Sequence, residues 1–256
     1  SCQVKISTIL KNKKTARLLV VIFWIAIWEI ASLVIGREVY LPSPLNTVRA
    51  LLRLSVTSKF WYSIAMTFIR VVAGFIISCL GGIILGIMCG LNKFLYELLN
   101  PLVIAVKSTP VMSIIIIALI WFQSGRVPVF VCFLMCFPII WTNAVEGIRQ
   151  VNRDLLQMAK VYRVNKGLII RRIYIPSVTP YLIAGITTAL GIGWKVTVAA
   201  EVLSNPKFSI GGNLYGAKVY LESSELFAWT SIVIILSFAF EYLFKYIIGK
   251  IERKGF

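Results

Sequence analysis

The chain has 256 residues, of which 59% are hydrophobic and only 14% are charged. Soluble domains contain about 45–50% apolar and about 25% charged residues, so this composition excludes a soluble protein and indicates a membrane protein. The formal net charge of +17 raises the question of a nucleic acid partner. The Lys and Arg residues instead gather on one side of the predicted membrane, where they report topology. The absence of histidine excludes histidine-based metal and acid–base chemistry.

Six apolar stretches are long enough to cross a membrane, since roughly 20 residues span ~30 Å of hydrocarbon. They are 18–36, 68–91, 101–122, 127–146, 178–203 and 227–248, with Pro138 tolerated inside the fourth. Eighteen of the 27 Lys and Arg residues, Lys107 among them, are assigned to the cytoplasmic side and seven to the outer side, which places both termini in the cytoplasm. The prediction is an all-α integral membrane protein with one transmembrane domain, 1–256. Its parts are a cytoplasmic segment 1–17, spans 1–4 in 18–146, a cytoplasmic loop 147–177, spans 5 and 6 in 178–248, and a tail 249–256.

The first outer loop, residues 37–60, contains a predicted surface helix. Leu41-Pro42-Ser43-Pro44 forms a rigid turn, and the leucines and valine at 45, 48, 51 and 52 then recur with helical spacing. This pattern predicts a short amphipathic helix at the outer interface. It is equally typical of a docking surface and of a membrane-surface anchor.

The second span carries Gly82, Gly86 and Gly90 at four-residue spacing. Small residues at this spacing share one helix face and let another helix approach closely, so they predict tight packing. Arg70 lies near the outer end of the same span, where it is interpreted as a snorkelling cation or one hydrogen-bonded to another helix.

The basic loop 147–177 is the most informative segment, because loops of hydrophobic membrane proteins are usually short. Asn152 caps a predicted helix that begins near Arg153, and its apolar face comprises Leu155, Leu156, Met158, Ala159 and Tyr162. Asn165 and Gly167 end it, and a second segment from Leu168 is expected to end before Pro176. Two short helices with a tight bend would project as an elbow. The elbow contacts an ATPase, or it is an amphipathic basic segment lying on anionic lipid.

The fifth span contains Lys195, and a lysine inside a span is a functional candidate by default. Trp194 and Glu201 are seven residues apart and share a face, whereas Lys195 is turned about 100° away. These three residues are predicted to line a substrate pathway. The following outer loop, 204–226, is rich in glycine and is interpreted as a gate or a docking site.

Together these motifs resemble the permease subunits of ATP-driven importers, in the nitrate/sulfonate/taurine branch. The loop matches that family's Glu-Ala-Ala pattern as Gln157-Met158-Ala159, with Tyr162 in place and Ile175-Pro176 where the next span begins. It departs at Gln157, where the family usually has Glu, and at Arg163, where it usually has Gly. Leu41-Pro42-Ser43-Pro44, the segment from Arg70 to Phe75 and the end of the fifth span at Glu201 are also similar to that branch.

The resemblance implies a type I importer, a multi-pass protein of the bacterial plasma membrane. Two permease copies, modestly favoured as a homodimer, would form the pore, with two ATP-binding subunits and an extracytoplasmic substrate-binding protein as partners. The loop 153–176 would couple to the ATPase through Gln157, Met158, Ala159, Lys160, Tyr162, Arg163, Val164, Asn165, Lys166 and Gly167. No catalytic or metal-binding residue is predicted, and no cofactor. ATP and Mg belong to the partner, because this chain has no phosphate loop. The substrate is expected to be a small solute. Lys195 and the oxyanion substrates usual in this branch indicate an anion, and a vitamin precursor is the alternative.

Three rival interpretations are weaker. A secondary transporter driven by an ion gradient typically has paired halves and membrane-embedded carboxylates, whereas the glutamates here lie toward span ends. A membrane-embedded enzyme would need a nucleophile–base pair or metal-ligand spacing, which the sequence lacks. A scaffold would leave the elbow and Lys195 without a role.

Overall fold

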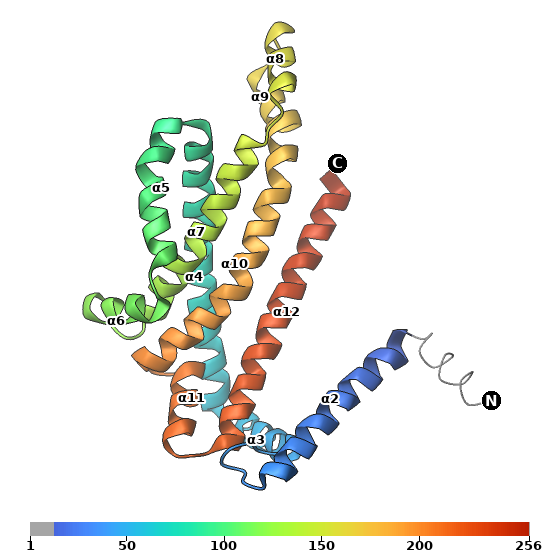
Figure 1. Cartoon of the computed structure of the whole chain (residues 1–256), viewed down its shortest axis with the longest axis vertical. Helices are drawn as coiled ribbons and strands as arrows, with labels where there is room; N and C mark the ends of the chain where they lie inside the picture. Colours follow the sequence, from blue (N-terminus) through green and yellow to red (C-terminus); the bar gives the residue numbers. More distant parts are fainter. Residues whose placement is uncertain (1–12, 256) are drawn as a thin grey trace, which may run out of the picture. The chain divides into compact units, whose positions relative to one another are not determined.

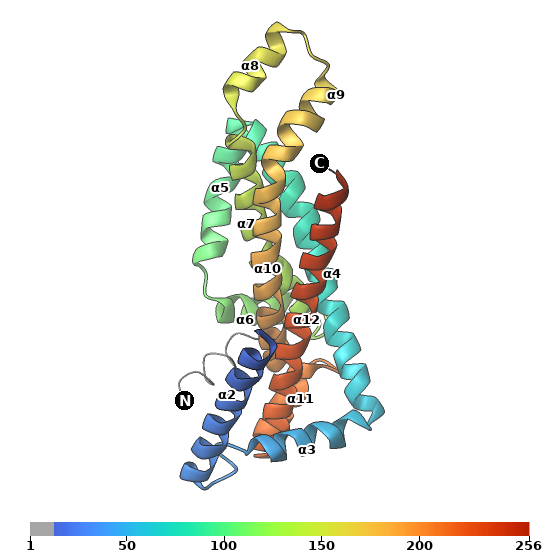
Figure 2. The ribbon, with the colours of Figure 1, turned by 90° about the vertical axis from the view of Figure 1, so that its right-hand side faces the viewer.

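The computed structural model describes the backbone of residues 13–255 and the side chains of 19–250. Residues 1–12 of the predicted cytoplasmic segment, and most side chains of the predicted tail, lie outside them. The described part is helical throughout (Figures 1 and 2). Its helices are α2 Lys13–Ile35, α3 Pro44–Ser55, α4 Ser58–Leu91, α5 Lys93–Ser108, α6 Val111–Trp121, α7 Val127–Arg149, α8 Arg153–Val161, α9 Lys166–Ile169, the π-helical turn η1 Ile170–Tyr174, α10 Ile175–Ser204, α11 Ile210–Val219 and α12 Ser223–Gly255. The described residues form two compact units, one of 13–60 with 213–232 and one of 61–212 with 233–255.

Four helices in the described residues are long and apolar enough to cross a membrane. They are Ser58–Leu91, Val127–Arg149, Lys166–Ser204 and Ser223–Lys250, and the bent pair α5 and α6 makes a fifth if it is one span. The segment Leu19–Ile35 is apolar but shorter. The prediction of an all-α membrane protein is therefore confirmed, whereas the count of six straight spans is not.

The predicted third span, 101–122, is wrong as a single helix. The helical segment starts earlier, at Lys93. The chain bends by 104° between α5 and α6, at residues 109 and 110, and the bend is visible in Figure 1. Thr109 has an extended backbone, because proline at the next position disfavours the helical conformation of the residue before it. Pro110 then precedes the first residue of α6. Hydrophobicity alone gave no sign of this break.

The smaller unit contains the predicted amphipathic helix, α3. Ser43 caps it by accepting a hydrogen bond from the amide of Asn46, and Pro44 occupies the first turn, where its missing N–H is not needed. Thr47 and Ala50 are buried, while the apolar side chains at 45, 48 and 52 are more than half exposed. This exposed stripe has the form expected of a docking surface and of a membrane anchor alike.

The larger unit is built around α7, which packs against α4 and α10. A Cβ atom placed on Gly82, Gly86 or Gly90 of α4 would lie 2.9, 2.5 and 2.6 Å from the Cβ atoms of Ile140, Ala144 and Ile148 of α7. The constant offset means that α4 and α7 run in the same direction along one small-residue seam. Helix α10 runs the opposite way against α7, with Gly185 opposite Asn143 and Gly193 opposite Cys136.

Candidate functional site

The elbow, defined as Arg153–Tyr174, extends beyond the ends of α7 and α10 (Figure 2). Its first helix, α8, begins where predicted: the Asn152 side chain accepts hydrogen bonds from the amides of Asp154 and Leu155. These bonds satisfy amides that have no partner within the helix. The Asn165 side chain caps α9 in the same way, by accepting a hydrogen bond from the amide of Gly167. Local capping chemistry therefore sets both starts.

A tight turn ends α8 and contains Arg163 in a left-handed conformation, with φ of 51°. The amide of Val164 donates to the carbonyl of Ala159 at 2.9 Å, and the amide of Arg163 donates to that of Lys160 at 3.1 Å. This pair of bonds defines a Schellman cap, whose left-handed position usually holds glycine. The turn expected at the family's glycine is present, although an arginine occupies it.

The apolar residues of α8 divide between two faces. Leu156 packs against the buried cluster of Ile148, Val151 and Val178, and Ala159 is buried. The outward side chains are Leu155, Met158, Val161 and Tyr162, with exposed fractions of 43, 54, 78 and 76%. These four residues form an uncovered apolar surface at the tip of the unit, called here the elbow face.

The second half of the elbow differs from the prediction, because it does not end before Pro176. Helix α9, the π-helical turn and α10 form one helical segment, Lys166–Ser204. The amide of Ile175 donates to the carbonyl of Ile170, five residues back. Pro176 follows directly. A proline is tolerated in the first turn after such a change, because the N–H that it lacks would not have been needed for a regular i to i−4 hydrogen bond there.

The remaining predicted coupling residues lie around the elbow face. Gln157, Lys160, Arg163, Asn165, Lys166 and Gly167 are exposed, and Val164 is half-buried. Below them an apolar pocket of about 500 Å³ opens between α4, α7 and α10, with Leu91, Ile148, Lys166 and Tyr174 in its lining. The elbow is therefore only partly packed against the helices that carry it.

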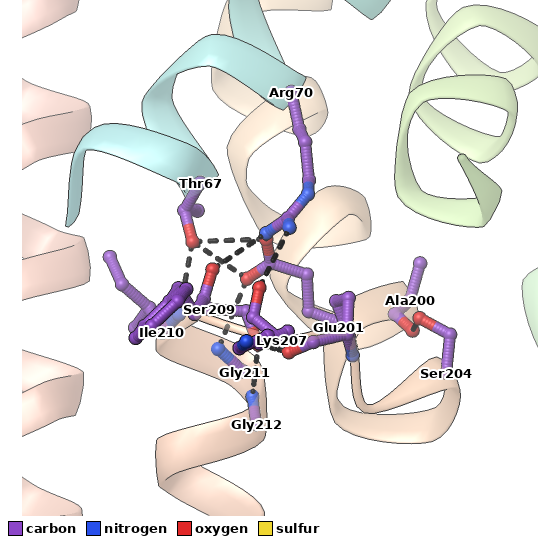
Figure 3. Close-up of polar contacts among 12 residues, drawn as sticks. Thr67, Arg70, Ala200, Glu201, Ser204, Lys207, Ser209, Ile210, Gly211 and Gly212 are labelled. Atoms are coloured by element: carbon purple, nitrogen blue, oxygen red, sulfur yellow. Dashed lines mark hydrogen bonds and ion pairs between the residues drawn. The ribbon is translucent and has the colours of Figure 1, made fainter. Parts of the chain in front are cut away.

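At the opposite end of α10, a buried polar cluster surrounds Glu201 (Figure 3). The carboxylate is fully buried and accepts hydrogen bonds from the Thr67 hydroxyl at 2.9 Å, from the Arg70 guanidinium at 2.8 Å and from the amide of Gly211 at 3.1 Å. Thr67 in turn accepts a hydrogen bond from the amide of Ile210. Of the two interpretations of Arg70, a snorkelling cation and a cation hydrogen-bonded to another helix, the structure shows the second, because Arg70 donates to Glu201 of α10.

Arg70 also holds the backbone of the loop between α10 and α11. Its guanidinium donates to the carbonyls of Lys207 and Phe208 at 3.2 and 3.1 Å. Phe208 has φ of 52° and Asn205 has φ of 41°, a left-handed region that is strained for a bulky residue such as phenylalanine. The bonds from Arg70 and Glu201 therefore stabilise a loop conformation that the local sequence does not favour.

The three predicted pathway residues are not brought together. Glu201 is enclosed in the polar cluster, and Trp194 is fully buried with Phe68 and Phe240, their ring centroids 6.2 and 6.3 Å from its own. Lys195 lies on the exposed side of α10. Of the three, only Lys195 is accessible to a solute. Two of the three residues predicted to line the pathway, Trp194 and Glu201, are thus enclosed in the described structure. The partners that enclose Glu201, Arg70 and Gly211, are distant from it in sequence, so the enclosure could not be inferred.

One charged residue has a partner that the sequence did not predict. Lys107, counted among the cytoplasmic charges, lies near the end of α5, where its ammonium donates a hydrogen bond to the Thr142 hydroxyl of α7 at 2.7 Å. A signal was present, because the lysine interrupts an apolar run just before Thr109-Pro110. Because α5 ends at Ser108, just after this lysine, the Lys107 side chain lies against Thr142 of α7.

Comparison with known proteins identifies the family. Residues 82–253 match the family described as "Binding-protein-dependent transport system inner membrane component". A bicarbonate transport system permease protein of Synechococcus elongatus is 33% identical over 159 residues, covering 62% of this chain and 57% of that protein. A nitrate import permease protein of the same organism is 31% identical over 191 residues, covering 70% and 68%. A taurine transport system permease protein of Escherichia coli is 23% identical over 220 residues, covering 84% and 80%.

A solved structure shows the same fold. An inward-facing methionine ABC transporter contains a chain that superposes with a TM-score of 0.55 at 17% identity, over 77% of this chain and 94% of that one. The family match and the apolar helices also confirm the predicted location, the bacterial inner membrane. The chain belongs to the inner membrane components of binding-protein-dependent transport systems.

Proposed function

We propose that this chain is the permease subunit of an ATP-driven importer, and that the elbow face is where a separate ATPase docks. The observation that carries the proposal is the elbow face itself. Four apolar side chains, among them Tyr162 at 76% exposure, are uncovered beyond the ends of the long helices. Exposed apolar surface on a folded unit marks an interaction site. Its cationic neighbours Lys160, Arg163 and Lys166 are positioned to select an acidic rim on the partner.

In this proposal the ATPase closes and opens beneath two permease copies, and each elbow transmits the motion to α10. The continuous segment Lys166–Ser204 supports this route, because it joins the elbow to α10 without a break in the helical backbone. A substrate-binding protein delivers the solute from the outer side. Hydrolysis of ATP, with its Mg, takes place in the partner, so this chain acts as a non-catalytic subunit.

The substrate that fits best is a small anion. Lys195 presents a cation on the exposed side of α10, and in the described residues no carboxylate forms an ion pair with it. The relatives named above are bicarbonate, nitrate and taurine permeases, and each of these solutes carries a negatively charged oxygen group, which supports the same class of solute. A transporter driven by an ion gradient is less well supported, because the buried carboxylate of Glu201 is already bonded to Arg70.

The test is ATP-driven uptake by the complex purified from its native membrane and placed in liposomes, with nitrate, bicarbonate and taurine as probes. The wild-type complex should contain an ATPase subunit and should take up one of the probes only when ATP is supplied. Tyr162→Ala should abolish uptake while ATP hydrolysis continues. Tyr242→Ala is the matched control, because that tyrosine is 74% exposed but lies on α12, far along the chain from the elbow. Uptake that ignores ATP and follows an ion gradient would overturn the proposal.

A further inference from the structure

The bend between α5 and α6 places a lysine inside the apolar part of the larger unit. Lys107 lies fourteen residues after the start of α5, about 21 Å along the helix at 1.5 Å per residue. Its partner Thr142 lies seven residues before the end of α7, about 10 Å from that end. Helix α5 lies beside α7, and the chain bends sharply between α5 and α6 (Figures 1 and 2). The ammonium therefore lies within the length of α7, a helix long and apolar enough to cross a membrane.

Thr142 orients this ammonium. The threonine hydroxyl donates its hydrogen to the carbonyl of Pro138 at 2.7 Å, so its oxygen is available to accept the hydrogen bond from Lys107, also at 2.7 Å. An ammonium group has three hydrogens to donate. One is used here, and among the described residues no further acceptor is bonded to Lys107. The remaining two can bind a ligand.

The charge of Lys107 is not neutralised within the described part of the chain. Among the described carboxylates of the larger unit, Glu97 pairs with Lys93, Glu201 with Arg70 and Glu241 with Lys245, and neither these nor Asp154 form an ion pair with Lys107. Glu146, one turn beyond Thr142 on α7, accepts a hydrogen bond from Gln150 and is not within ion-pair distance of Lys107. An unpaired cation is costly against lipid, so residues of this kind face a water-filled path or a protein partner.

Lys107, on α5, and Lys195, on α10, are two such cations. Helix α6 follows α5 in the chain and packs against α10. The side chains of α6 pack against both α7 and α10, in a cluster that includes Ile115, Val131 and Val196. Both lysines are exposed on this framework. Two exposed cations without a paired carboxylate create a positive potential, which favours an anion over a neutral or cationic solute.

We propose that Lys107, held by Thr142, binds the anion on its way through the membrane. This inference rests on the proposed function and assigns the solute a contact that the sequence placed outside the membrane. The ligand class is a small anion with oxygen acceptors, such as nitrate, bicarbonate or a sulfonate. Thr142 is a positioning residue, because it acts by orienting the ammonium.

The first measurement is uptake by the complete complex, with whichever of the three probes the wild type transports. Lys107→Met should lower uptake about tenfold or more, as expected when a charge-assisted hydrogen bond to an anion is lost. Lys107→Arg should retain most of it, because the cation is kept. Lys93→Met is the matched control on the same helix: Lys93 is 88% exposed near the start of α5 and should tolerate the change. Wild-type uptake together with normal uptake by Lys107→Met would overturn this inference alone, whereas absent ATP-driven wild-type uptake would overturn the proposed function.

The second measurement asks what Lys107 faces, and it does not require transport. Lys107→Cys in the complex should react with an anionic sulfonate thiol reagent, faster than with a cationic reagent of the same size. Leu102→Cys, 62% exposed on another face of α5, should resist both, and the wild type reports the background from the native cysteines. A position 107 that resists both reagents is covered by lipid or by a partner's carboxylate, and either result would overturn the inference.

Discussion

The two ends of α10 differ in what their polar and apolar groups contact. At one end, Glu201, Arg70 and Thr67 satisfy one another and hold the strained loop at Phe208. At the other end, the elbow is shaped by local caps and leaves the elbow face uncovered. The first end is closed by contacts between residues distant in sequence, and the second is left open for a partner. The residues that stabilise the fold and the residues available for docking therefore lie at opposite ends of α10.

Breaking the buried ion pair should have the largest effect on stability. Arg70→Met leaves the carboxylate of Glu201 buried without its cation, and such a loss costs about 3–5 kcal/mol. Chemical unfolding of the purified protein in mild detergent measures the change. Lys93→Met removes the exposed pair with Glu97 and should change stability little. Similar results for the two variants would mean that the polar cluster is not the stabilising end.

Crowding the seam between α4 and α7 should have the next largest effect. At Gly86 an added Cβ would lie 2.5 Å from the Cβ of Ala144 and 2.9 Å from the carbonyl of Trp141. Gly86→Leu should therefore destabilise the protein by about 1–3 kcal/mol, the usual range for overpacking. At Gly191 no atom outside the backbone of its own helical turn lies within 4 Å of an added Cβ. Gly191→Ala should leave the unfolding midpoint unchanged or raise it, and a loss there equal to that of Gly86→Leu would contradict the packing argument.

Relieving the turn at the end of α8 should stabilise the elbow. A left-handed conformation costs a non-glycine residue roughly 1–2 kcal/mol, and glycine returns part of this gain by loosening the unfolded chain. Arg163→Gly should therefore raise stability by about 1 kcal/mol or less. Leu221 has φ of 57° in the same kind of cap after α11, so Leu221→Gly should give a similar gain. A stability loss in both variants would show that these side chains make compensating contacts.

Truncating the elbow face should have the smallest effect on stability. Met158→Ala and Tyr162→Ala remove exposed atoms and should shift the unfolding free energy by no more than about 0.5 kcal/mol. Leu156→Ala, on the packed face of the same helix, should cost more. Equal losses on the two faces would mean that the elbow face is packed in the free protein, and the contrast between the two ends of α10 would disappear.

Local signals predicted much of this protein. The cap at Asn152, the start of α3 after Ser43 and the glycine seam at Gly86 each depend on neighbouring residues or on helical spacing. The failures are of another kind. The bend at Thr109-Pro110 sits inside an apolar run, where hydropathy does not distinguish a straight span from a broken one. Pro176 was expected to stop a helix that a change in hydrogen-bond pattern allowed to continue.

By itself the sequence determined the class of protein, because membrane insertion depends on the amount and spacing of apolar residues, and these are properties of the chain alone. It also determined the first helix of the elbow and the turn that ends it, since caps and such turns are set within a few residues. Only the tertiary structure decided the roles of the charged residues. Glu201 is enclosed by Arg70, and Lys107 is directed onto Thr142. Those partners are far away in the sequence, and a charge inside a membrane takes its role from what packs against it.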